Sequence, residues 1–133
     1  MNENELGKII VDCVFKVHTT LGPGLLESVY EIALAHELTK RSLTAERQCA
    51  VPITYDDTTF DQGFRADIIV NDLAIIEIKS IEKVNPVHKK QLLTYLKLTN
   101  KRLGFLINFN SALIKNGITR VANGVEDWTS QKS

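Results

Sequence analysis

Two neighbouring apolar runs near the middle of this chain are accompanied by charged side chains, one of them inside the second run. The runs, at residues 68–70 and 73–78, are rich in isoleucine and flank an Asn-Asp pair at residues 71–72. β-Branched runs separated by Asn and Asp predict two strands joined by a tight turn. Glu77 lies inside the second run and Lys79 directly follows it, although burying a charge is costly unless the charge is paired or binds a metal. The sequence therefore predicts a pair of strands that hold charged groups at the edge of a sheet.

Asp67, directly before the first run, is the second carboxylate of this region. Glu77 and Lys79 are two residues apart, so their side chains point to one face of a strand. A two-residue turn would place Asp67 opposite Ile76 and aim it away from Glu77. A three-residue loop or a bulge would restore Asp67 opposite Glu77, because a register slip of one residue exchanges the faces. We predict this second arrangement, in which Asp67, Glu77 and Lys79 share one face.

The remaining pattern predicts the element order ααβββαββ. Alternation of helices and strands favours an α/β fold with a central mixed β-sheet flanked by helices, in which the third helix joins parallel strands. In the second helix we expect the inward positions to be Leu26, Val29, Ala33 and Leu34. The expected elements are a helix with the stripe Leu6, Ile10, Cys13 and Val17, a helix at 25–41, strands at 47–55, 59–70 and 73–80, a helix at 86–98, and strands at 102–109 and 117–122.

Length and composition favour a single domain over residues 1–133, with a frayed polar tail at 124–133. No apolar stretch approaches about 18 to 20 residues, so no membrane span is expected. The polar N-terminus argues against a signal peptide. Cys13 and Cys49 are expected to be buried free thiols in a reducing cytoplasm.

The net charge is zero, but the charges are unevenly distributed. Between residues 54 and 77 six acidic residues accompany one arginine, whereas between residues 79 and 102 seven basic residues accompany one glutamate. The acidic half could hold metal ions and the basic half could meet phosphate groups. The alternative for the basic half is an ordinary solvated helix face.

The spacing of the charged residues resembles the PD-(D/E)xK nuclease superfamily. Nine residues separate Asp67 from Glu77, and one residue separates Glu77 from Lys79, while Ala66 stands where the superfamily name has proline. The resemblance extends over about residues 18–120 and implies a restriction-endonuclease-like core.

Two further motifs carry the resemblance. Gly24, Glu27 and Tyr30 match the signature of the GxxExxY protein family, a small branch of that superfamily. Gln91 and Tyr95 are similar to the QxxxY helix motif of the exonuclease-like members. The motifs occur along the chain in the order that the family has.

The activity that the resemblance implies is metal-assisted hydrolysis of phosphodiester bonds. Mg²⁺ is the implied cofactor, with Mn²⁺ as an alternative, and hard oxygen ligands suit both. Lys79 would position the attacking water or stabilise the developing charge. The implied metal ligands are Asp67, Glu77, the carbonyl of Ile78, and Glu27 either directly or through water. The implied contacts to nucleic acid, with DNA expected over RNA, are Gln91, Tyr95, Lys83, Lys89 and Lys90.

Several of these residues also have plainer explanations. Glu27 could be a first-turn acid favoured by the helix dipole, and Tyr30 a core residue. Gln91 and Tyr95 lie on one helix face, so they could touch substrate or brace Lys79. The three histidines, at 18, 36 and 88, are too scattered to predict a metal cluster.

Two other classes of function stay open on the same fold. The first is a catalytically silent nucleic-acid-binding module, since a fold does not fix a function. The second is a protein-interaction subunit whose basic helix docks an acidic partner. A homodimer or a separate partner chain is compatible with either.

Overall fold

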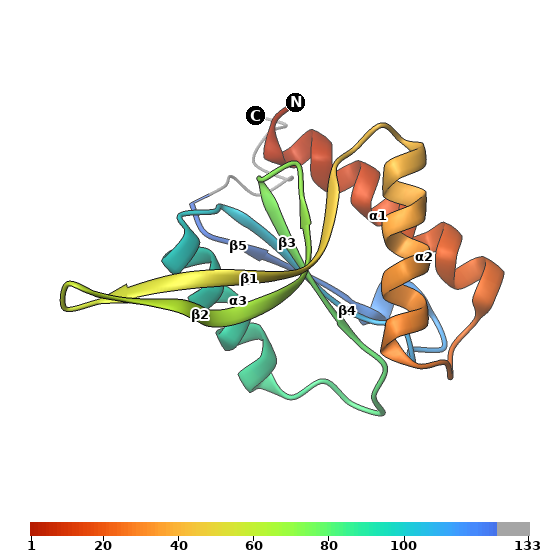
Figure 1. Cartoon of the computed structure of the whole chain (residues 1–133). Coiled ribbons are helices and arrows are strands. Elements are labelled where there is room, and N and C mark those ends of the chain that lie inside the picture. The colour runs from red at the N-terminus through yellow and green to blue at the C-terminus, as the bar shows by residue number, and fades with distance from the viewer. Residues whose placement is uncertain (125–133) are drawn as a thin grey trace, which may run out of the picture.

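The computed structural model describes residues 1–124, and the predicted tail beyond Gly124 lies outside the described residues. The order ααβββαββ is confirmed, with one short 3₁₀ helix in addition (Figure 1). The elements are α1 (Glu3–Leu21), α2 (Glu27–Lys40), β1 (Ala45–Tyr55), β2 (Thr58–Val70), β3 (Ala74–Lys79), α3 (Pro86–Thr99), β4 (Leu103–Asn108), η1 (Ile114–Gly117) and β5 (Ile118–Ala122).

The strands form one five-stranded mixed sheet in the order β1-β2-β3-β4-β5. β3 and β4 are parallel and are joined through α3, while the other neighbours are antiparallel. α1 and α2 pack on one face of the sheet and α3 on the other (Figure 1). All six residues of β4 are buried, as its strongly apolar sequence predicts, and they include the polar Asn108 at its end. The predicted α/β class with helices flanking a mixed sheet is confirmed.

Helix α2 presents a different face to the core from the one predicted. Leu26 is 74% exposed and Val29 is 39% exposed, and Ala33 is only partly buried. The helix begins at Glu27, so Leu26 is its N-cap, and the buried stripe at spacing i, i+4, i+8 is Tyr30, Leu34 and Leu38. The prediction was wrong for Leu26 and Val29 because apolar residues occur on more than one side of this helix.

Helices α1 and α3 both begin at a side-chain cap. Asn2 accepts a hydrogen bond from the backbone N–H of Glu5, whose carboxylate accepts one from the Asn2 backbone. Asn85 and His88 form the corresponding capping box on α3, where Pro86 occupies the first turn. Such reciprocal caps satisfy the free N–H groups of a helix start.

None of the helices in residues 1–124 is both long enough and apolar enough to cross a membrane. The two cysteines are free thiols. Cys13 is buried, as predicted, whereas Cys49 is only partly buried, at the margin of the apolar cluster that contains Leu92 and Leu96 of α3.

Candidate active site

A three-residue loop at 71–73 joins β2 to β3. The ladder pairs Val70 with Ala74 and Ile68 with Ile76, so one further step along the strands sets residue 67 opposite residue 77. Asn71 and Asp72 adopt positive φ angles of 52° and 54°, a conformation that Asn and Asp tolerate better than most residues. Of the two predicted alternatives, a three-residue loop or a bulge, the structure has the three-residue loop.

The structure brings Asp67 and Glu77 together through the backbones of the two strands. The Asp67 N–H donates to Glu77 Oε2 at 3.1 Å. The Ile78 N–H donates to Asp67 Oδ2 at 2.8 Å. Each carboxylate thus accepts a backbone N–H at the point where the ladder between the strands ends. We call Asp67 and Glu77 the acid pair.

The negative charge of the acid pair is only partly compensated by Lys79. Burial, followed by the negative charge of Asp67, raises the pKa of Glu77 to about 8, and the positive charge of Lys79 only partly opposes this rise. At pH 7 the isolated pair therefore holds a proton on Glu77. Two adjacent carboxyl groups, one of them buried with a raised pKa, are a donor set that suits a hard divalent cation.

Glu27 and Asp67 line the same cavity of about 400 Å³, together with Ser28, Glu31, Arg47 and Gln48. Glu27 is exposed at the first residue of α2. Among residues 1–124 no three His, Cys, Asp or Glu side chains are gathered closely enough to hold one metal ion. Glu27 therefore lies near Asp67 across this cavity, and its role as a ligand, directly or through water, stays a prediction.

The sequence did not single out Glu31, Arg47 or Gln48. Glu31 is 5% exposed, and Arg47 Nη2 lies 2.8 Å from its Oε2. A signal was present, since Glu27 and Glu31 are four residues apart and so share a helix face. Their partners on β1 are set by the packing of α2 on the sheet, which no local pattern reveals.

Tyr95 of α3 lies near the acid pair. Its ring stacks on Phe64 with centroids 3.8 Å apart and planes 3° from parallel. Burial, and then the charges of Glu77 and Asp67, raise the pKa of the Tyr95 phenol. Gln91 is exposed one turn earlier on the same helix.

The lysines predicted to contact nucleic acid are all at the surface. Lys83, in the loop after β3, and Lys89 and Lys90, in the first half of α3, are exposed. Both predicted explanations, a phosphate-binding surface and an ordinary solvated helix face, require this exposure.

Tyr30 is a core residue. Its hydroxyl donates to the carbonyl of Gly22 at 2.6 Å and accepts from the N–H of Leu25 at 3.0 Å. Its ring stacks on Phe109 with centroids 4.5 Å apart. Tyr30, the tyrosine of the GxxExxY-like stretch, therefore holds the loop before α2 in place. This loop determines the position of Glu27, the first residue of the helix.

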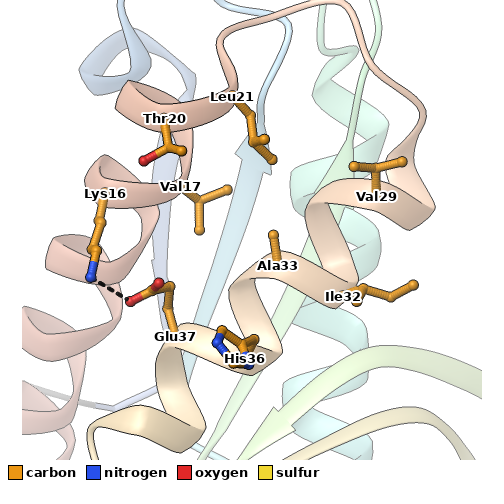
Figure 2. Close-up of a pocket in the computed structure, with 9 residues that line it drawn as sticks. All are labelled: Lys16, Val17, Thr20, Leu21, Val29, Ile32, Ala33, His36 and Glu37. Atoms are coloured by element: carbon orange, nitrogen blue, oxygen red, sulfur yellow. Dashed lines mark ion pairs between the residues drawn. The ribbon is translucent and has the colours of Figure 1, made fainter.

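A second cavity, also of about 400 Å³, lies between α1 and α2 and is mainly apolar (Figure 2). Lys16 and Glu37 form an ion pair at 3.2 Å along one side of it, and the exposed side chain of His36 also lines it. None of the predicted site residues contributes to it. His18 and His88 both make structural hydrogen bonds. His18 bonds the carbonyl of Ser111, and His88 accepts the Asn85 N–H in the cap of α3.

A family model described as the PD-(D/E)XK nuclease superfamily matches residues 4–121. The match covers most of the chain and includes all the elements that position the acid pair. The chain therefore belongs to the PD-(D/E)XK nuclease superfamily. No curated protein matches it.

Proposed function

We propose that this chain is a divalent-metal-dependent nuclease of the GxxExxY branch, which hydrolyses phosphodiester bonds of nucleic acid in the cytoplasm, DNA rather than RNA. Membership of the superfamily supports a nuclease. The observation that carries the proposal is the acid pair, in which two carboxylates from neighbouring strands are locked together beside Lys79.

Asp67 and Glu77 would hold a Mg²⁺ or Mn²⁺ ion, with the Ile78 carbonyl as a further oxygen. When bound, the ion would lower the pKa of a coordinated water and offset charge on the phosphate. Glu27 faces the shared cavity from α2 and would act on that water or its proton. Lys79 would supply a fixed positive charge for the charge that develops on phosphate oxygens, a task for which a compact ammonium is suited.

The test is cleavage of single- and double-stranded DNA and RNA with Mg²⁺ or Mn²⁺, by wild type and by Lys79→Ala. We expect Lys79→Ala to abolish cleavage, since a charge partner of the transition state contributes several kcal/mol to the barrier. Its melting temperature should stay near that of wild type, because Lys79 is at the end of β3 and only partly buried.

The matched control is Lys97→Ala, an exposed lysine in the last turn of α3. This variant should keep the cleavage rate at saturating substrate and show a flatter dependence of binding on salt. Equal cleavage by wild type and Lys79→Ala would rule out the proposed role of Lys79. Absence of cleavage by wild type on every substrate would favour a silent nucleic-acid-binding module.

A further inference from the structure

Gln48 occupies a strained backbone position in the first half of β1. Its φ is +52°, a region that costs an L-residue about 1 to 2 kcal/mol. The residues on either side of it pair with residues 68 and 66 of β2, so Gln48 lies at the position opposite Asp67. A strained non-glycine residue persists only where its surroundings hold it.

The side chain of Glu31 holds this position from α2. Gln48 Nε2 donates to Glu31 Oε1 at 2.6 Å. Arg47 donates to the other oxygen, Oε2, from Nε at 3.0 Å and from Nη2 at 2.8 Å. Both oxygens of the buried Glu31 carboxylate therefore accept hydrogen bonds from consecutive residues of β1, and these bonds link β1 to α2.

The kink in β1 coincides with a change of face in β2. Ala66 packs in the cluster that contains α3, whereas Ile68 packs in the cluster that contains α1 and α2. Residues two apart in a regular strand share a face, so β2 turns over at Asp67. The Asp67 carboxylate then points toward β3, where it accepts the Ile78 N–H.

We propose that Gln48 is a positioning residue of the acid pair, and that Glu31 and Arg47 hold it in the kinked conformation that aims Asp67 at β3. The inference deepens the proposed function and depends on it for any effect on turnover. The positioning itself is a property of the metal-free protein, so it can be measured without turnover.

The direct measurement is the ratio of two hydrogen-exchange rates, that of the Ile78 amide divided by the mean rate of the β4 amides. Gln48→Ala should raise this ratio about tenfold, because alanine is strained at positive φ and lacks the amide that Glu31 holds. Gln48→Gly should raise it less, since glycine adopts positive φ freely. Glu31→Gln should also raise it, because one oxygen acceptor is lost. The control is Gln62→Ala, at an exposed glutamine of β2, for which no change is expected.

A ratio within twofold of wild type in both Gln48→Ala and Glu31→Gln would overturn the inference, as would an equal rise at Ile78 and throughout β4. If Gln48→Ala fails to fold, the same measurement is made on Gln48→Gly and Glu31→Gln. A ratio within twofold of wild type in both of these variants would then overturn the inference. In a protein that cleaves, we further expect Gln48→Ala to lower kcat with KM unchanged. A selective rise at Ile78 in a protein that cleaves nothing would support the positioning and refute the proposed nuclease. Cleavage by wild type with no change in exchange at the Ile78 amide in the variants would support the nuclease and refute the positioning role of Gln48.

Discussion

Replacement of Glu77 by glutamine should stabilise the metal-free protein at neutral pH. The pKa of Glu77 is raised from 4.5 to about 8, first by burial and then by the charge of Asp67. A carboxyl whose pKa is raised in the folded state stabilises that state while it is protonated. This contribution is fully present below about pH 4.5 and is lost progressively as the pH rises to about 8.

The size of the effect follows from the shift. One pKa unit corresponds to about 1.4 kcal/mol. Between pH 4.5 and pH 7 the unfolded chain releases the Glu77 proton while the folded protein retains it, so the free energy of unfolding should fall by roughly 3 kcal/mol over that range. Glutamine has no proton to lose, and its Oε1 can still accept the Asp67 N–H. The difference in free energy of unfolding between Glu77→Gln and wild type should therefore grow by roughly 3 kcal/mol over that range.

The assay is urea unfolding of both proteins in EDTA from pH 4.5 to pH 9, with Glu82→Gln as the control at an exposed carboxylate. Added Mg²⁺ should stabilise wild type and leave Glu77→Gln nearly unchanged, since the cation needs the ionised carboxylate. Parallel pH profiles for wild type and Glu77→Gln would show that Glu77 is an ordinary carboxyl, and the electrostatic basis of the site would be wrong.

Three stability predictions concern the surroundings of the site. Tyr30→Phe loses the hydroxyl that bonds Gly22, so urea unfolding should show a loss of about 1 to 3 kcal/mol. Asn108→Ala removes the side chain that bonds both the N–H and the carbonyl of Ile81; we expect a loss of about 2 kcal/mol and faster exchange of the Ile81 amide. Gly117→Ala would place a Cβ 2.3 Å from the Asn108 carbonyl oxygen, and its Tm should fall by several degrees. Wild-type values for any of the three would refute the corresponding contact.

The parts of the site that the sequence predicted are those set by short-range geometry. Asp67 and Glu77 lie ten residues apart across one hairpin, so strand alternation and loop length decide whether they face each other. The kink at Gln48 and its link to Glu31 depend instead on how α2 packs on β1. The buried face of α2 was mispredicted at Leu26 for a related reason, since apolar residues surround the helix and only the packing of Tyr30 selects a face.

The two hairpin turns around Asp67 differ in how they would respond to a change in chain length. The turn at 56–57 lies at the exposed end of the β1–β2 ribbon, so residues inserted there would lengthen the ribbon and leave the register at its base intact. One residue inserted at 71–73 would shift β3 against β2 and turn one carboxylate of the pair to the opposite face. The outer turn can therefore change in length without disturbing the acid pair, whereas the length of the inner loop is fixed by the site.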